Sequence, residues 1–303
     1  MTDQVRIIEV GPRDGLQNER IPIPVDAKLR FVSKLLNAGI HEIEVTSFVS
    51  PKWVPQLGDA QILWPQLPPG GLYSALIPNI KGLERALEVG VERIALFTAA
   101  SESFTQKNIN MSIAQSLETF GEVIAQFRAA KPQGWVRGYV STAFECPYEG
   151  RISPERTCDV ARRLIELGVD EVSIGDTIGV AAPDEVRALT KRLIDVLPVE
   201  RLTYHFHDTY GCAIANVAEA LELGVASFDS SAGGLGGCPY APGATGNLAT
   251  EDLVYFLRRS GVAISPDLVR LSQATLEILQ ILGRQPTAKA QVAQLAASET
   301  CPT

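Results

Sequence analysis

The sequence predicts an α/β fold, a TIM (β/α)8 barrel with extra C-terminal helices. One joint recurs four times, in residues 37–43, 88–94, 166–172 and 222–228: an apolar-periodic helix ends at a glycine, and a short apolar run follows. Strand and helix patterns alternate at a spacing of roughly 30 to 50 residues, which indicates βα units and a parallel sheet. Eight strand candidates can be counted, and eight strands alternating with helices predict a closed barrel.

The expected elements follow one another along the whole chain. Strands are expected at 5–10, 42–45, 72–77, 93–98, 136–142, 171–176, 201–207 and 227–232, and helices between them at 25–38, 80–89, 113–130, 154–167, 183–197 and 213–223. Two further helices, at 251–260 and 266–282, precede an alanine-rich tail. Because no linker divides the chain, residues 1–303 are predicted to form one catalytic domain, with residues 251–303 as a C-terminal helical extension beside the barrel or against a partner subunit.

An open, doubly wound sheet is the alternative architecture. It would need a glycine-rich phosphate-binding turn after the first strand. The sequence there is Gly11-Pro12-Arg13-Asp14-Gly15, which lacks the spacing of a dinucleotide-binding motif. The barrel therefore remains the prediction.

The composition excludes some classes of partner. The chain has 303 residues, a net charge of −8 and no basic stripe, so we expect no nucleic-acid partner. No apolar run approaches membrane-spanning length, so we expect no membrane partner. The five cysteines are odd in number and scattered, as is typical of reduced thiols, and the first strand begins too early for a signal or transit peptide. We therefore expect a cytoplasmic protein.

Two of the three histidines, His205 and His207, lie one residue apart at the end of the seventh predicted strand. Side chains two positions apart on a strand point to the same face, so both imidazoles can converge on one point. Neutral imidazole binds divalent metals at cellular pH, which favours a metal site. The alternative is a pair of core histidines with satisfied hydrogen bonds.

Polar side chains also follow the first two strands, at the end of a barrel where catalytic groups gather. Asp14 could be a cation ligand, and Arg13 beside it could stabilise a developing oxyanion. An exposed polar turn is the alternative. Glu44, within the second strand, either needs a buried partner or points into the barrel mouth, where it could orient Arg13.

Two later strand ends add further candidates. Asp176, after the sixth strand, could accept a hydrogen bond behind the site or contact a substrate, or it could cap the following turn. A glycine-rich loop follows the eighth strand and is predicted to form a lid. It contains Cys238, which could exchange a proton, and Asn247, which offers a neutral oxygen ligand.

The chain resembles the 3-hydroxy-3-methylglutaryl-CoA lyase family, metal-dependent lyases built on a TIM barrel. The resemblance covers essentially the whole chain and is strongest in residues 11–19, 47–55, 108–110, 137–140, 146–150, 175–179, 205–211 and 234–251. It implies cleavage of 3-hydroxy-3-methylglutaryl-CoA, an acyl-CoA substrate, to acetyl-CoA and acetoacetate. It also implies a homodimer, and leaves open whether the pathway is leucine degradation with ketone body formation or another acyl-CoA route.

The resemblance also implies roles for individual residues. Mg²⁺ or Mn²⁺ would be held by Asp14, His205, His207 and Asn247. Arg13 would stabilise the enolate, Cys238 would be the catalytic thiol, and Glu44 would support the arginine. Polar contacts to the substrate, or behind those contacts, would come from Gln17, Ser47, Ser173 and Asp176. The base for the hydroxyl proton stays open among Asp14, His205 and a metal-bound water.

Some positions depart from the family pattern. Residues 231–234 read Ser-Ala-Gly-Gly where the family has Ser-Val-Ala-Gly, and the extra glycine could loosen the lid; Ala-Phe-Glu at 143–145 could alter the acyl pocket. A lyase for a bulkier 3-hydroxy-3-alkylglutaryl-CoA is therefore an alternative. Two further alternatives are a Claisen-type synthase or aldolase, which would share the barrel and the metal site, and a catalytically silent binding barrel. Cys301 is either a redox-sensitive thiol between subunits or an inert tail cysteine.

Overall fold

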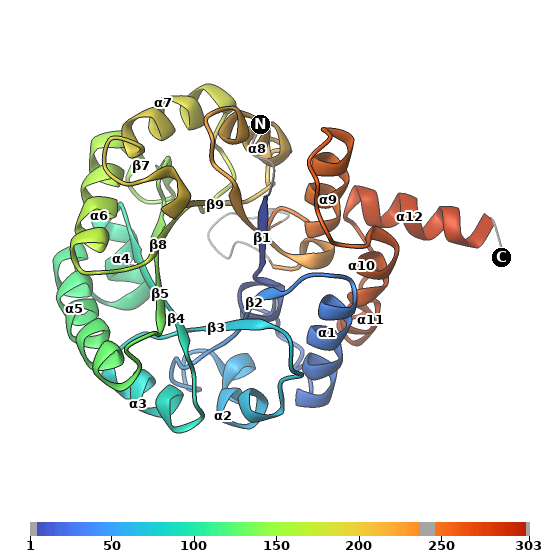
Figure 1. The fold of residues 1–303 in the computed structure, drawn as a ribbon, viewed down its shortest axis with the longest axis horizontal. Coiled ribbons are helices and arrows are strands. Elements are labelled where there is room, and N and C mark those ends of the chain that lie inside the picture. The colour runs from blue at the N-terminus through green and yellow to red at the C-terminus, as the bar shows by residue number, and fades with distance from the viewer. Residues whose placement is uncertain (1–4, 237–245, 301–303) are drawn as a thin grey trace.

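The computed structural model describes residues 5–236 and 246–300. Its centre is a closed barrel of eight parallel strands, which confirms the predicted TIM barrel (Figure 1). In order around the ring these strands are β1 (Arg6–Glu9), β10 (Ser227–Ser230), β9 (Leu202–Phe206), β8 (Glu171–Asp176), β5 (Trp135–Ser141), β4 (Arg93–Ala99), β3 (Leu72–Leu76) and β2 (Glu42–Ser47). Because all are parallel, their carboxyl ends open at one mouth.

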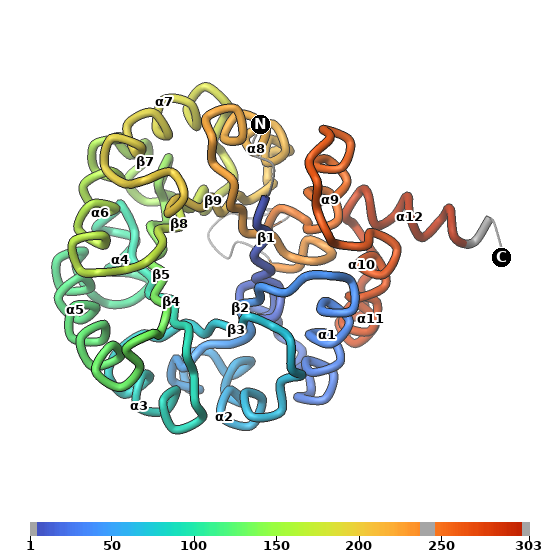
Figure 2. Tube along the Cα trace, viewed as in Figure 1, coloured from blue at the N-terminus to red at the C-terminus, as the bar shows by residue number. Residues whose placement is uncertain are grey.

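Helices surround the barrel as an outer ring (Figure 1). They are α1 (Val25–Asn37), α2 (Ala60–Leu63), α3 (Ile80–Glu88), α4 (Glu102–Ile109), α5 (Ile113–Ala130), α6 (Pro154–Glu166), α7 (Pro183–Leu193) and α8 (Ala213–Glu222), followed by α9 (Thr250–Arg259), α10 (Leu268–Ala274), α11 (Leu276–Leu282) and α12 (Lys289–Thr300). Helix α9 contacts α8 and helix α10 contacts α1, so both fill the ring between its last and first members. Helix α12 projects outward (Figure 2). None of the helices in the described ranges could cross a membrane.

The recurring joints form as expected. The glycines that follow α1, α3, α6 and α8 are Gly39, Gly90, Gly168 and Gly224, and their φ angles of 90°, 80°, 92° and 89° are left-handed. Each ends its helix by turning the chain toward the next strand. The sequence pattern therefore located four of the helix-to-strand connections.

Several elements differ from the predicted ones, and the short helices α2 and α4 were not predicted. The helix expected at 183–197 ends at Leu193, whose carbonyl accepts hydrogen bonds from the amides of Val196 at 2.8 Å and Leu197 at 2.9 Å in a closing turn. The helix expected at 266–282 is interrupted at Thr275, whose buried hydroxyl accepts a hydrogen bond from the Gln291 side chain at 2.7 Å. A short hairpin, β6 (Glu145–Cys146) with β7 (Gly150–Arg151), follows β5 and was not predicted.

The barrel interior is charged, whereas branched aliphatic side chains usually fill this fold. Arg6 on β1 pairs with Glu171 on β8 at 2.6 Å, and Arg137 on β5 pairs with Asp229 on β10 at 2.6 Å. Neither pair comes from neighbouring strands, so both ion pairs cross the interior. Arg137 also lies 3.0 Å from Glu171, which links the two pairs. The main apolar core lies instead between the strands and the helices.

Candidate active site and metal centre

A single π-helical turn, Gly11–Gly15, follows β1 and carries Arg13 and Asp14. The carbonyl of Val10 accepts hydrogen bonds from the amides of Arg13 at 3.1 Å, Asp14 at 2.7 Å and Gly15 at 3.2 Å, and the last of these closes the wider π-helical turn. Turns of this type are frequent at functional sites. A side chain at position 11 would meet the Glu9 carboxylate at 2.5 Å, so the turn needs glycine there.

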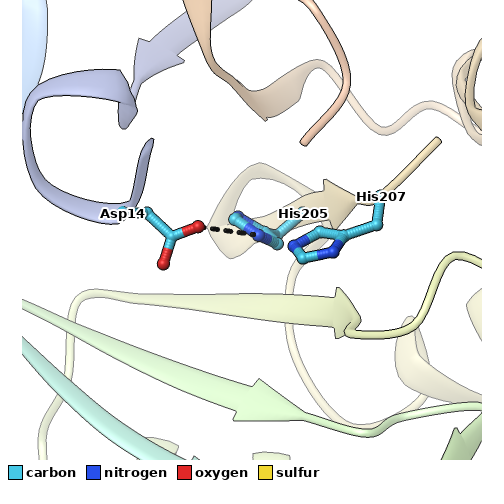
Figure 3. Close-up of side chains that lie close together, drawn as sticks. All are labelled: Asp14, His205 and His207. Atoms are coloured by element: carbon cyan, nitrogen blue, oxygen red, sulfur yellow. Dashed lines mark ion pairs between the residues drawn. The ribbon is translucent and has the colours of Figure 1, made fainter. Parts of the chain in front are cut away.

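Three potential metal ligands meet at the mouth of the barrel. Asp14 comes from the π-helical turn, His205 from β9, and His207 from just beyond β9 (Figure 3). One ligand atom from each lies within 4.8 Å of the others. The carboxylate faces the two rings, with Asp14 Oδ2 4.0 Å from His205 Nε2. The predicted convergence of the histidines on one point is thus observed, together with a carboxylate.

Asn247 joins this group through the backbone. It forms an antiparallel bridge with His207, and its Nδ2 donates to Asp14 Oδ2 at 2.9 Å and to the Leu235 carbonyl at 3.1 Å. Its Oδ1 is buried and has no hydrogen-bond partner among the described residues, and the same is true of His207 Nδ1. Two orphaned lone-pair atoms beside a carboxylate are what a cation site leaves unsatisfied in the protein alone.

The charge states of the ligands also suit a cation. Burial acts to raise the pKa of Asp14, but Arg13 and the two histidines more than offset it and lower the value to about 2. Burial, followed by the charge of His205, lowers the pKa of His207 to about 3. The aspartate is therefore ionised and His207 neutral at cellular pH, as metal ligands must be. These residues fit a divalent cation.

Arg13 is held between two carboxylates. Its Nε donates to Glu44, and its Nη1 lies 2.6 Å from Asp14 Oδ1. Glu44 in turn accepts a hydrogen bond from the Tyr139 hydroxyl at 3.1 Å, and the guanidinium lies 5.5 Å from the centre of the Tyr139 ring. Burial acts to lower the pKa of Arg13, but Glu44 and Asp14 raise it above its ordinary value. The site thus presents a fixed positive charge beside the ligand cluster.

Comparison with known proteins decides the family. A model of the HMGL-like family matches residues 4–278. The chain belongs to the HMGL-like family. It is similar to the mitochondrial hydroxymethylglutaryl-CoA lyase of Bos taurus, with 49% identity over 288 residues that cover 94% of this chain and 88% of the relative.

A bacterial relative and a solved structure agree with this family. The 3-hydroxy-3-isohexenylglutaryl-CoA/hydroxy-methylglutaryl-CoA lyase of Pseudomonas aeruginosa is 50% identical over 295 residues, which cover 97% of this chain and 98% of that protein. The crystal structure of hydroxymethylglutaryl-CoA lyase from Pseudomonas aeruginosa has a TM-score of 0.94 at 48% identity, and the match covers 98% of this chain and 99% of that one.

The remaining predicted residues fall into two groups. Gln17 and Ser47 lie near the mouth: Gln17 Nε2 donates to Asp14 Oδ1 at 2.8 Å, and Ser47 Oγ accepts from an amide just after β2 at 3.1 Å. Ser173 and Asp176 instead form hydrogen bonds with other protein groups. Ser173 donates to Asp229 at 2.9 Å, and Asp176 accepts from the amides of residues 180 and 181 at 3.1 and 3.0 Å, as expected of a residue that caps a turn. Burial raises the pKa of Asp176 to about 6.

Two predicted cysteines lie outside the described residues. Cys238 falls in the range 237–245 and Cys301 in the range 301–303, so their roles stay predictions. The start of the loop is described, and it includes Gly233, where this chain departs from the family pattern. Gly233 has a φ of 66°, and its amide donates to Glu251 at 2.7 Å. The added glycine therefore lies in a defined turn.

Sequence reasoning missed Asp229 and Tyr139, which contact His205 and Glu44 respectively. Both lie within strands that also pack against the core, so no loop motif marks them. One available clue was a charged or polar residue in the middle of an apolar strand, as in Arg137-Gly138-Tyr139 and Phe228-Asp229.

Proposed function

We propose that this chain is a divalent-metal-dependent carbon–carbon lyase that cleaves 3-hydroxy-3-methylglutaryl-CoA to acetyl-CoA and acetoacetate. The observation that carries the proposal is the cluster of Asp14, His205 and His207 with the Arg13 guanidinium 2.6 Å from the shared carboxylate. Family membership supports it, because the similar proteins from cattle and Pseudomonas aeruginosa are named for this reaction.

The cation would be Mg²⁺ or Mn²⁺, held by Asp14, His205, His207 and Asn247. The donors are carboxylate and amide oxygens and imidazole nitrogens, without a thiolate among the described residues, and this set suits such ions. When bound, the cation would supply a Lewis acid that lowers the pKa of the substrate's C3 hydroxyl and fixes the substrate.

The protein's own groups would handle the charge and the protons. A base removes the C3 hydroxyl proton, the C2–C3 bond breaks, and its electron pair passes to the thioester as an enolate while C3 becomes the ketone of acetoacetate. Arg13 would stabilise the enolate oxygen, oriented by Glu44 through its Nε. Cys238 would return a proton to the enolate carbon, which completes acetyl-CoA.

Residues around this centre would support it. We assign substrate contacts to Gln17 and Ser47, which lie nearest the mouth, and a supporting role behind the site to Ser173 and Asp176, whose polar atoms bond to other protein groups.

We also propose that the protein is cytoplasmic and forms a homodimer. The three described cysteines are free thiols, and α12 projects from the barrel where a second subunit could cover it (Figure 1). Light scattering on the purified protein would measure the mass of the oligomer.

One assay tests the function. The purified protein is treated with a chelator, offered 3-hydroxy-3-methylglutaryl-CoA, and assayed for acetoacetate before and after Mg²⁺ or Mn²⁺ is added back. We expect release only with the metal. Absence of metal-dependent release, in a protein that remains folded by circular dichroism, would refute the lyase assignment.

A lyase for a bulkier 3-hydroxy-3-alkylglutaryl-CoA is the second candidate. A small apolar cluster, separate from the main core, consists of Leu76, Ala95 and Tyr139 with the half-buried Phe97 packed against it. Tyr139 lies edge-on to His205 with ring centres 6.1 Å apart, so this cluster borders the site. Phe97, its only partly exposed member, would offer an apolar contact for the C3 substituent. Comparing kcat/KM for 3-hydroxy-3-alkylglutaryl-CoA thioesters with a methyl and an isohexenyl group separates the two candidates.

A Claisen-type synthase is tested by supplying a 2-oxo acid with acetyl-CoA and measuring the condensation product.

A further inference from the structure

Asp229 is a buried carboxylate behind the site, in strand β10, and only 1% of its surface is exposed. It has three side-chain partners from three other strands. Arg137 Nη2 donates to Oδ1 at 2.6 Å, Ser173 Oγ donates to Oδ2 at 2.9 Å, and His205 Nδ1 lies 3.1 Å from Oδ2. Asp229 and His205 are also direct neighbours in the register of β10 and β9. The carboxylate is therefore fixed from several sides.

This contact determines which nitrogen of His205 faces the metal cluster. The ion pair with Arg137 favours an ionised carboxylate, which can only accept hydrogen bonds. In the neutral ring that binds a metal, His205 Nδ1 must then carry the proton, which leaves a lone pair on Nε2. Nε2 is the nitrogen on the side of Asp14, 4.0 Å from Oδ2.

The two histidines of the cluster are held differently. His207 Nδ1 has no hydrogen-bond partner within the described residues, whereas His205 Nδ1 is bonded to Asp229. We infer that Asp229 is a positioning residue, which fixes the ring and the tautomer of His205 for metal binding and is itself held by Arg137 and Ser173. The inference rests on the proposed metal-dependent function. Carboxylates behind metal-ligating histidines generally act in this way.

A purely structural role would be to neutralise Arg137. Glu171 provides the matched control, because it is the other anionic partner of Arg137, is equally buried and makes no contact with His205. In Asp229→Asn, the amide must turn its oxygen toward Arg137 and its NH₂ group toward His205 Nδ1. That arrangement favours the wrong tautomer, while Glu171→Gln weakens the ion pairs of Glu171 with Arg137 and Arg6 and leaves the Asp229–His205 contact in place.

Mn²⁺ binding to the full chain, measured by titration calorimetry, separates the two roles. We expect Asp229→Asn to weaken Mn²⁺ binding about 10- to 100-fold, and Glu171→Gln to stay near the wild-type affinity. With saturating metal, the KM for 3-hydroxy-3-methylglutaryl-CoA of Asp229→Asn should change less than its metal affinity. Equal losses in both variants, or a folded Asp229→Asn that binds like the wild type, would overturn the inference.

A second measurement needs no substitution at Asp229. The chain has only three histidines, so nitrogen NMR of histidine-labelled, metal-free protein can be assigned with His41→Gln and His207→Gln. At a pH where the ring is neutral, we expect His205 to carry its proton on Nδ1. A neutral ring with the proton on Nε2 would overturn the inference even if Asp229→Asn failed to fold.

The outcome is separable from that of the proposed function. If wild-type protein binds no Mn²⁺ and releases no acetoacetate, the function fails. If the wild type does both while the NMR and the Asp229→Asn titration contradict the expected results, only the positioning role fails.

Discussion

At the scale of single residues, the site depends on the planar fork of Arg13. Its Nε bonds Glu44 and its Nη1 bonds Asp14, so one guanidinium connects the second strand to the potential metal ligand. Only 3% of its surface is exposed, and the low-dielectric surroundings strengthen its effect on any charge that develops nearby. The same guanidinium thus links two elements of the site and supplies a fixed positive charge.

Arg13→Lys should separate these contributions. An ammonium cannot bond both carboxylates in the same plane, so we expect kcat to fall about 100-fold or more, with a smaller change in Mn²⁺ affinity. Steady-state kinetics at saturating metal provide the measurement. Arg151→Lys, at an exposed position on the β6–β7 hairpin, is the control and should be neutral. Near-normal turnover in Arg13→Lys would contradict the enolate-stabilising role.

The sequence could predict the cluster of potential metal ligands, but not the residues that hold these ligands in position. The His205–His207 spacing on one strand and the polar turn after β1 placed three potential ligands at the same barrel mouth, because parallel strands all end there. Asp229 escaped prediction because its contacts depend on the register of strands far apart in the sequence. The role of Cys238 stays a prediction.

At the scale of elements, the Glu9 carboxylate ties the turn that carries Arg13 to both ends of the glycine-rich loop. It accepts hydrogen bonds from the amides of Gly11 at 2.8 Å and Ala232 at 2.9 Å, and from the Thr250 hydroxyl at 2.7 Å. The first contact belongs to the π-helical turn, the second to the start of the loop, and the third to the first residue of α9. One carboxylate therefore fixes the π-helical turn, residue 232 and the start of α9 relative to one another.

Gly236→Ala tests the tightness of that assembly. Gly236 has a φ of 114°, and an added Cβ would lie 2.7 Å from Asn247 Nδ2. Gly70→Ala is the matched control, with a φ of 98° and nothing within 4 Å of the added Cβ. We expect both to lose about 1–2 kcal/mol of unfolding free energy from the backbone, and only Gly236→Ala to weaken Mn²⁺ binding as well. Identical Mn²⁺ affinities in the two variants would show that Asn247 is not disturbed.

Element boundaries were predicted where local chemistry determines them. The four glycine joints are local features, and the structure has them at the expected positions. The interruption at Thr275 instead depends on a hydrogen bond from Gln291 in a later helix, and the β6–β7 hairpin comprises two-residue strands too short to show a pattern. Neither feature is therefore marked by a local sequence pattern.

At the scale of the whole molecule, Glu9 and Glu251 are among the acidic groups that lie buried outside the barrel's ion pairs. Burial is the main cause of the raised pKa of both Glu9, at about 7, and Glu251, at about 8. Between the ordinary pKa of 4.5 and these values, these two side chains bind more protons in the folded chain than in the unfolded chain. The contribution of these groups to stability is therefore present at low pH and is lost as the pH rises through this window.

Urea unfolding at pH 5 and pH 8 measures this loss. Glu251→Gln keeps an acceptor for the Gly233 amide but cannot ionise, so we expect the decrease in unfolding free energy between the two pH values to shrink by on the order of 3 kcal/mol. Glu92→Gln, an exposed site, should leave the decrease unchanged. A Glu251→Gln protein with the wild-type pH dependence would show that Glu251 does not titrate in this range.

The ion pairs inside the barrel are shielded from the surrounding solvent. Dissolved salt screens charges that water can reach, but it has little access to Arg137 and its two carboxylate partners, which are 1–3% exposed. The charges of a polyanionic thioester that approaches the mouth from solution are, in contrast, screened by dissolved salt. Ionic strength should therefore govern how often substrate arrives, while the framework that receives it keeps the same geometry in dilute and concentrated buffer.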